Sequence, residues 1–393
     1  MFQLQTGLAR PSGSQNMRSR KNHKVSSHQV QAHARHLLEP LLGTGTGTTA
    51  ALLKVVLTAA AQAISLFAAC LRLQSMSDQT ARASLRARLP KRRAALEAKL
   101  NATLRGSVSR STRRHRRTIA CDLHEIPYHG TAAKNHLRGN KSRDGTTQFF
   151  VYATACIVEH GHRFTLAHTW VQRSDTMVTV LERLLDGIDQ AAVPIRRLLL
   201  DRGFFRNNVL AYLCGRNVPF LMPVMFRGRK PAPGKAATGW RTFLQKKAGW
   251  HSHTLMADDQ SIRINVCVGY KTYRHHRTGR RQNRKLVFAA AGTRETPRRI
   301  CVEYRRRFGI EASYRQLGQA RIRTSTRDPI LRLFFVGLAL VLRNLWAWLQ
   351  GLLSGEKPNP RQQAAAKRRQ FRRLLMIMIE GIQQENAFDP LLT

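Results

Sequence analysis

Apolar residues recur at helical spacing through about the first hundred positions of the chain. The pattern predicts helices from His36 to Leu104, interrupted by the Gly-Thr run at Gly43–Thr49. That run lacks the GKS or GKT ending of a phosphate-binding loop, so we expect a flexible connection between helices. Within Ser84–Leu104 the sequence fits either one amphipathic basic helix or two helices separated at Pro90.

Beyond residue 118 the pattern changes to the short apolar runs typical of buried strands. A first run, Thr118–Leu123, is followed by two β-rich runs that flank His160-Gly161 and predict a hairpin. Helix and strand signals then alternate, an order that indicates an α/β protein with a mixed sheet. The expected elements are strands at Gln148–Val158 and His162–Val171, a helix at Asp175–Ile188, a strand at Leu198–Leu200, a helix at Asn207–Cys214 and a strand at Val218–Val224.

The C-terminal half begins with a return of alternating apolar and polar residues. Met225–Gly292 has a basic start rich in Pro and Gly and then alternates, which predicts a β-rich insertion. Thr296–Thr324 predicts a very basic helix or helix pair. Asp328 and Pro329 form a good start for the long apolar helix that follows. Part of the tail, Gln362–Gln384, is also expected to be helical.

Two apolar stretches are long enough to raise the question of a membrane. Thr49–Leu73 contains Lys54, and Ile330–Leu353 contains Arg332 and Arg343. Because a charge near the middle of a membrane span is costly, both stretches are expected to be buried helices of a soluble protein. The polar N-terminal segment lacks the apolar core of a secretory signal.

Charge changes the picture more than any other bulk property. The 393 residues include 67 Lys and Arg against 22 Asp and Glu, a formal net charge of +45. Such a surface repels itself unless a polyanion neutralises it, and nucleic acid is the usual polyanion. A membrane-surface protein usually shows a basic amphipathic anchor and a ribosomal-type protein is usually shorter, so both alternatives fit less well. The hydrophobic content of 42% fits a globular protein.

Cysteine and histidine usage argues against a zinc protein. The six cysteines are scattered without a CxxC pair, which suits the reducing cytosol and excludes a disulfide framework or a zinc ribbon. His124, His129 and His136 lie near one another in sequence, but no cysteine completes a zinc set. We expect these histidines to be polar loop residues, with His124 a candidate neighbour of the acidic residue beside it.

Acidic residues are scarce, so three in apolar or arginine-rich surroundings stand out. Asp122 ends one short strand, Asp201 ends another, and Glu311 lies on a helical segment among arginines. Singly, each aspartate could equally cap a turn. Together the three fit phosphodiester cleavage, in which two Mg²⁺ ions, replaceable by Mn²⁺, activate the nucleophile and stabilise the leaving oxygen. Mg²⁺ prefers oxygen ligands, which the three carboxylates supply. Asp122 is assigned to bridge both ions because the first strand is central in this class of site, and Asp201 and Glu311 are assigned to hold one each.

The surroundings of two of these acids resemble a known family. Tyr304, Arg307 and Glu311 match the first three positions of the pattern Y-x2-R-x3-E-x6-K, and Asp201 opens a D-R-G-aromatic sequence after an apolar strand. These blocks resemble the insertion-sequence transposases of the DDE type, in the cut-and-paste group with a β-strand insertion before the glutamate. The resemblance covers roughly residues 118–350. It implies an α/β fold with an RNase H-like core and a mixed sheet.

The same resemblance implies partners and roles. A transposase of this type cleaves DNA at its element's ends and transfers the freed 3′-hydroxyl to target DNA, as a homodimer or larger synaptic complex. It would work in the cytoplasm, associated with the nucleoid. Tyr304 and Arg307 would grip a phosphate at the transposon end. The signature lysine would fall at Gly318, so Arg315 or Arg321 is expected to supply that charge. The predicted DNA-binding set is Tyr304, Arg307, Arg315, Arg202, Arg113, Arg114, Arg116 and Arg117.

Two other functions stay open at the level of sequence. A basic DNA-binding protein without catalysis, such as a decayed or domesticated copy, would explain the charge, although the intact acidic trio speaks against it. A stand-alone nuclease would cut DNA without joining it. Trp240 or Trp250 could stack on a flipped base, but simple packing is the favoured interpretation of both.

These expectations divide the chain into six segments. They are a mobile basic arm (residues 1–35), a helical basic DNA-binding region and linker (36–117), the first part of the RNase H-like core (118–224), the β-rich insertion (225–295), the second part of the core with the glutamate (296–353) and a basic tail (354–393).

Overall fold

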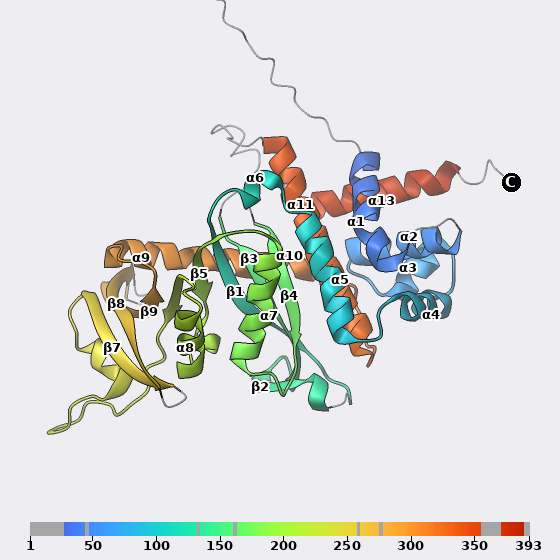
Figure 1. The fold of residues 1–393 in the computed structure, drawn as a ribbon. Coiled ribbons are helices and arrows are strands. Elements are labelled where there is room, and N and C mark those ends of the chain that lie inside the picture. The colour runs from blue at the N-terminus through green and yellow to red at the C-terminus, as the bar shows by residue number, and fades with distance from the viewer. Residues whose placement is uncertain are drawn as a thin grey trace, which may run out of the picture.

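A large sheet occupies the middle of the molecule, with the N-terminal helices at one side and the strands of the insertion at the other (Figure 1). The computed structural model describes residues 27–43, 47–131, 134–159, 163–257, 260–274, 278–354 and 371–388.

The core of the sheet is built around strand β1 (Arg117–Pro127). On one side β1 pairs antiparallel with β3 (Thr146–Ile157), which pairs antiparallel with β4 (Thr165–Val171). On the other side β1 pairs parallel with β5 (Ile195–Leu200), which pairs parallel with β6 (Phe220–Pro223). This mixed sheet confirms the predicted hairpin and the predicted succession of strands; the turn of the hairpin lies outside the described residues.

Two strands differ from the prediction. β1 does not stop at Leu123 but continues to Pro127, because it pairs with β3 along its whole length. The histidine-containing segment that was expected to be a loop is therefore partly strand. β2 (Arg138–Arg143) was not predicted at all. It adds to β3 as an exposed edge strand, and its polar sequence RGNKSR carries no apolar alternation that could reveal it.

The predicted β-rich insertion is present and extends the core sheet. β7 (Gly249–Ala257), β8 (Gln260–Arg274) and β9 (Arg281–Ala291) are antiparallel neighbours. β9 also pairs with β6 of the core, so the insertion does not form a separate sheet. A short 3₁₀ helix, η3 (Gly239–Leu244), precedes these strands.

Helices cover both faces of the sheet (Figure 1). The helical signals at residues 175–188 and 207–214 are confirmed on one face, and the basic segment after the insertion forms a helix pair on the other. The helices are α7 (Met177–Gln190) and α8 (Asn207–Gly215) on the first face, with η2 (Arg202–Phe204) between β5 and α8, and α9 (Pro297–Tyr304), η4 (Arg305–Arg307) and α10 (Phe308–Ala320) on the second.

Alternate side chains of β1 point to opposite faces of the sheet and so contact different helices. Ile119 and Cys121 pack in the hydrophobic cluster of α7 and α8, whereas Ala120 packs with Ile310 of α10. Because successive strand residues point to opposite faces, Asp122 points to the same face as Ala120. One predicted acid is therefore directed toward the helix that carries another.

A second hydrophobic core joins the two ends of the chain. Apolar residues of the N-terminal helices pack against α11 (Pro329–Ser354) and α13 (Phe371–Phe388). Asp328 begins α11 as predicted, since its Oδ1 accepts from the backbone N–H groups of Ile330 and Leu331. The remaining helices are α1 (Ser27–Leu42), α2 (Thr48–Ala61), α3 (Leu66–Leu73), α4 (Asp78–Arg88), α5 (Arg93–Gly106) and α6 (Arg110–Arg113).

The N-terminal predictions need one correction. The prediction of a mobile arm over residues 1–35 is wrong for residues 27–35, because helix α1 begins at Ser27. Val30, Ala34 and Leu38 are spaced four residues apart and are fully buried in the second core, a stripe easily overlooked in so polar a sequence. Residues 1–26 lie outside the described residues. The break predicted near Pro90 is confirmed as the two-helix alternative, with α4 before it and α5 after it.

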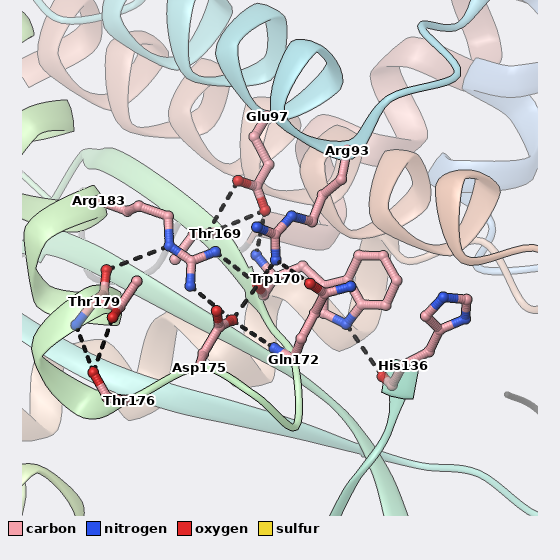
Figure 2. Close-up of polar contacts among 10 residues, drawn as sticks. All are labelled: Arg93, Glu97, His136, Thr169, Trp170, Gln172, Asp175, Thr176, Thr179 and Arg183. Atoms are coloured by element: carbon pink, nitrogen blue, oxygen red, sulfur yellow. Dashed lines mark hydrogen bonds and ion pairs between the residues drawn. The ribbon is translucent and has the colours of Figure 1, made fainter. Parts of the chain in front are cut away.

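Helix α5 is fixed to the core by polar contacts (Figure 2). The buried carboxylate of Glu97 accepts from the backbone N–H of Trp170 at 2.7 Å and from the Thr169 hydroxyl at 3.1 Å. Arg93 donates to the Gln172 side chain at 2.9 Å. Since Thr169 and Trp170 belong to β4, these bonds tie the N-terminal helices to the edge of the sheet. Burial raises the pKa of Glu97, although hydrogen bonds and nearby arginines oppose the shift.

The long apolar helix is buried as predicted. By length and composition α11 could cross a membrane over Pro329–Gly351, but 89% of its apolar window is buried inside the protein. Helices α2 and α3 pass the same test only as a pair bent by 119°, and nothing else in the described part of the chain does. The apolar side chains of α11 are therefore buried by the rest of the protein, and α11 is a core helix of this fold.

Candidate active site

Asp122 and Asp201 are neighbours because β1 and β5 are parallel and adjacent. The register aligns Cys121 of β1 with Leu200 of β5, so the next residue on each strand is an aspartate. Asp201 is the residue at which β5 ends and the short helix η2 begins. Two acids that are 79 positions apart in sequence thus meet at one edge of the sheet.

Arg307 joins these aspartates to the third acid. Its Nη1 donates to Asp122 Oδ2 at 2.9 Å, and its Nη2 donates to Glu311 Oε1 at 2.8 Å. Nη2 also lies 3.8 Å from Asp201 Oδ1. Glu311 follows Arg307 by one turn of α10, which explains how one guanidinium reaches both the helix and the sheet. The structure therefore brings all three predicted acids together.

The site holds more negative than positive charge. The Asp122 side chain is only 13% exposed, whereas those of Asp201 and Glu311 are 41% exposed. Burial raises the pKa of Asp122 to about 6; Arg307 opposes this shift, and the charges of Asp201 and Glu311 add to it. One guanidinium thus compensates three carboxylates incompletely.

Two tyrosines hold the backbone at the aspartates. The Tyr314 hydroxyl donates to the carbonyl oxygen of Asp122 at 2.9 Å and lies 2.7 Å from the Thr154 hydroxyl. The Tyr304 hydroxyl donates to the carbonyl oxygen of Leu200, next to Asp201, at 3.1 Å. Burial raises the pKa of both phenols, so both stay protonated donors. Tyr314 was not among the site residues predicted from the sequence, although its place one helical turn after Glu311 was a usable signal.

His124 was expected to lie in a loop, and this expectation is wrong. It is a residue of β1, and its ring stacks on Tyr314 with centroids 4.7 Å apart. Burial, together with the charges of Arg321 and Arg143, lowers the pKa of His124 to about 4, so it is neutral. Its predicted place as a neighbour of Asp122 is correct, because it contacts the tyrosine that holds the Asp122 backbone.

The donor chemistry of the trio suits a hard divalent cation, since carboxylate oxygens are the preferred ligands of Mg²⁺. Nevertheless, no group of three or more His, Cys, Asp or Glu side chains in the described part of the chain is arranged to hold a metal ion. Instead, the guanidinium of Arg307 lies among the carboxylates. In this structure the three carboxylates surround the guanidinium of Arg307.

The predicted DNA-binding arginines divide into exposed and engaged side chains. Arg202 and Arg315 are exposed on either side of the trio, and Arg114 and Arg116 are exposed before β1. Arg117 was predicted to contact DNA, but it is buried and its Nη1 donates to Glu159 at 3.0 Å, so it stabilises the start of β1 instead. The half-buried Arg113 donates to the carbonyl oxygen of Arg105 at 2.7 Å.

The position of the signature lysine opens onto a cavity. Gly318 is exposed and has nothing within 4 Å of where a side chain would begin. It lines a cavity of about 700 Å³ together with Arg321 and Tyr152. Burial lowers the pKa of the Arg321 guanidinium, and no carboxylate of the described residues forms an ion pair with it. Of the two arginines predicted to replace the lysine, Arg315 is exposed and Arg321 lies largely buried in this cavity.

Both tryptophans of the insertion pack as expected. Trp240 is buried against Phe205 with ring centroids 5.0 Å apart. The indole N–H of Trp250 donates to the carbonyl oxygen of Glu295 at 2.9 Å. Trp250 is partly buried and packs against the hydrophobic cluster between the sheet and α10.

Comparison with known proteins agrees with this geometry. The family model described as Transposase DDE domain matches residues 113–345, more than half of the chain, and includes all three acids. Among curated proteins no match was found. The fold is similar to that of a solved piggyBac transposase synaptic complex with hairpin DNA, with a TM-score of 0.50 at 10% sequence identity, over 92% of this chain and 78% of that one.

The likeness to the solved transposase concerns the fold, and it supports the RNase H-like core with its mixed sheet. The family match adds what the fold alone does not, because it spans the strands and the helix that carry Asp122, Asp201 and Glu311. The chain therefore belongs to the DDE transposase family and is an enzyme that acts on DNA.

Proposed function

We propose that this transposase cleaves DNA at the ends of its own element and joins the freed 3′-hydroxyl to target DNA, with Asp122, Asp201 and Glu311 as its catalytic residues. The observation that carries the proposal is the convergence of the three acids on Arg307, at the sheet edge where β1 and β5 run side by side. Three carboxylates around one cation leave an excess of negative charge, which favours binding of further cations.

The trio would hold two Mg²⁺ ions, or Mn²⁺ in their place, with Asp122 shared between them because it is the most buried and central acid. When bound, such ions activate the attacking oxygen and stabilise the leaving one. Tyr314 and Tyr304 are positioning residues, since they fix the backbone at the two aspartates. Arg307, whose guanidinium lies among the carboxylates, would donate to a DNA phosphate once it no longer pairs with them.

The DNA contacts proposed around the trio are those of exposed arginines. Arg202 and Arg315 flank the carboxylates, and Arg114 and Arg116 extend the positive surface before β1. Tyr304, whose hydroxyl is already engaged, is assigned to the backbone rather than to a phosphate. Joining two ends requires a homodimer or larger synaptic complex, and the substrate places the protein with the nucleoid in the cytoplasm.

The test compares wild type with Glu311→Gln on DNA that carries the element's own ends, with Mg²⁺ or Mn²⁺. Glu182→Gln, an exposed residue of α7 on the other face of the sheet, is the matched control. We expect wild type and the control to release a 3′-hydroxyl end and join it to a second duplex. Glu311→Gln should bind the same DNA but cleave at least about a hundredfold more slowly.

Asp201→Asn is expected to behave like Glu311→Gln, losing cleavage and retaining DNA binding, because the Asp201 side chain is partly exposed and its contact with Arg307 among the described residues is as long as 3.8 Å. Near-normal cleavage by Asp201→Asn would remove that residue from the site. If wild type binds DNA but never cuts, the non-catalytic DNA-binding function replaces the proposal. If wild type cuts without joining, the protein is a nuclease.

A further inference from the structure

A basic groove lies beside helix α10 and outside the carboxylate trio. It has a volume of about 740 Å³. Its floor includes Phe308 and Gly309 at the start of α10, and its walls come from segments far apart in sequence. The charged side chains that line it are Arg116, Arg163, Arg196, Arg305, Arg306 and one acid, Glu159.

The groove carries positive charge that the described protein does not neutralise. Glu159 is already bound to Arg117 and to the backbone N–H of Thr118. Arg196 donates to Glu303 at 2.8 Å. The other four arginines are exposed, and none of them forms an ion pair with a carboxylate of the described residues. Such a hollow attracts a polyanion more strongly than isolated surface arginines do.

The groove and the trio lie on two sides of the same short segment. In the triplet Arg305–Arg307, the third arginine donates to Asp122 and Glu311, whereas the first two line the groove. Arg116 precedes Asp122 by six positions of chain, which at the rise of a strand is about 20 Å. DNA in the groove would therefore lie beside the trio but would not occupy it.

We propose that this groove binds the phosphate backbone of the target duplex. The inference rests on the proposed function, since only a transposase that joins ends needs a second duplex. The groove offers guanidinium groups, which pair well with phosphate oxygens, and one exposed phenylalanine. We therefore expect binding there to depend mainly on phosphates and on salt concentration.

The choice of the target rather than the donor duplex follows from the distribution of arginines. Arg202 and Arg315 already flank the trio and are assigned to the donor end. Strand transfer brings a phosphodiester of a second duplex to the same three acids, and this duplex needs a positive surface of its own within reach. The groove supplies that surface, because it is lined in part by α10, the helix that carries Glu311.

The experiment separates end cleavage from joining. Two groove variants are used, Arg163→Ala and the double variant Arg305→Ala/Arg306→Ala. The matched control is Arg298→Ala/Arg299→Ala, which removes the same charge from exposed positions of α9 that do not line the groove. Each protein is given DNA with the element's ends, and a plasmid of unrelated sequence serves as the target.

We expect both groove variants to cleave ends as wild type does and to join them to the plasmid about tenfold less well. The salt dependence of binding to an unrelated duplex should fall by about one unit of log–log slope for each lost phosphate contact. The control should match wild type in joining. Joining at the wild-type rate by both groove variants would overturn the proposal.

Loss of cleavage together with joining in Arg163→Ala would show that the groove holds the donor duplex, and this also overturns the assignment. Arg163 serves this purpose because it lies away from Arg307 in sequence, so its loss leaves the triplet intact. If wild type itself neither cuts nor joins, the proposed function fails, and the target groove fails with it. Failure of the proposed function is therefore seen in the wild-type protein, whereas failure of the groove proposal alone is seen in the groove variants.

Discussion

The ion pair of Arg307 with Asp122 shows how one guanidinium can hold a cluster of carboxylates together. The guanidinium is 10% exposed and the carboxylate 13% exposed, so their ion pair is poorly solvated. Removing one partner of a buried pair leaves the other charge uncompensated, which costs more than the pair itself contributes. Here the loss is larger because Glu311 and Asp201 depend on the same guanidinium.

The first prediction concerns this residue. Arg307→Ala is expected to lower the free energy of unfolding by about 3 kcal/mol at neutral pH, because three carboxylates lose their shared cation. Added Mn²⁺ should then raise the melting temperature of the variant more than that of wild type. Chemical denaturation and thermal melting with and without Mn²⁺ measure both effects.

Arg307→Lys is the control for that prediction. It keeps the charge, but its single ammonium nitrogen cannot take the places of both Nη1 and Nη2, which bind Asp122 and Glu311 separately, so an intermediate stability is expected. Wild-type stability in Arg307→Ala, with no added response to Mn²⁺, would show that the guanidinium does not hold the cluster.

At this scale the sequence predicted which acids lie together better than where each arginine lies. Asp201 and Glu311 were found from local motifs, and Asp122 from its place at the end of an apolar run. Arg116 and Arg117 could not be told apart, because their difference arises from strand parity and from Glu159, which is 42 positions away from Arg117. Arg307 was predicted to grip a phosphate, since nothing local shows that α10 brings it against Asp122.

At the scale of elements, the meeting of β4, α5 and α7 shows how a buried acid can fix one helix to a sheet edge (Figure 2). Glu97 accepts bonds from Thr169 and Trp170 of β4, and Arg183 of α7 lies 2.7 Å from Asp175 in the same group. The two contacts of Glu97 join residues more than 70 positions apart. Helical periodicity predicts α5 but does not reveal its partner.

The second prediction uses the raised pKa of Glu97. A carboxyl whose pKa is higher in the folded than in the unfolded protein contributes stability below its ordinary value of 4.5, and this contribution is lost as pH rises through the folded value. Glu97→Gln keeps the shape and cannot ionise, so the stability of this variant should fall less than that of wild type in the pH range above about 4.5. Denaturation midpoints across this range measure the difference.

The exposed substitution Glu182→Gln should leave the pH profile of stability unchanged, because that side chain lies in solvent. Glu97→Ala should be destabilising at every pH, since it leaves the Trp170 N–H without its acceptor. A profile for Glu97→Gln that is as steep as that of wild type would mean that Glu97 does not titrate in this range.

The third prediction concerns the close approach of α5 to α11. A Cβ added at Gly337 would lie 2.6 Å from the Leu100 side chain, whereas one added at Gly351 on the same helix would meet nothing within 4 Å. Gly337→Ala should therefore lower the free energy of unfolding by about 1–3 kcal/mol through overpacking. Gly351→Ala should be neutral or slightly stabilising, because alanine favours the helix.

Thermal melting of the two variants gives the comparison, and Leu100→Ala provides a second check. If the clash is with Leu100, adding Leu100→Ala should cost Gly337→Ala less than it costs wild type. Equal melting temperatures for Gly337→Ala and Gly351→Ala would mean that the helices are not packed this closely.

At the scale of the whole molecule, two hydrophobic cores stabilise different parts of the fold. One core fills the sheet and its helix layers, which position the acids. The other joins α1–α5 to α11 and α13 and lies to one side of the sheet (Figure 1). The order of strands, the insertion and the long apolar helix were predictable from periodicity. The packing of the N-terminal helices against α11 and α13 could not be predicted in this way. An apolar stripe shows that a helix is buried, but it does not show which element the helix packs against.

This packing leads to the last prediction. A protein beginning at residue 110 would lack α1–α5 and would expose α11, which is apolar enough to resemble a membrane span. Each fully exposed leucine costs about 1.5–3 kcal/mol, so several of them exceed the whole stability of a typical domain. We expect this fragment to aggregate, whereas a protein beginning at residue 27 keeps every described element and melts in the same way as the full chain. Size-exclusion chromatography and circular dichroism distinguish these outcomes. A soluble fragment from residue 110 with the full chain's melting temperature would instead establish the N-terminal helices as an independent module, free to bind DNA on their own.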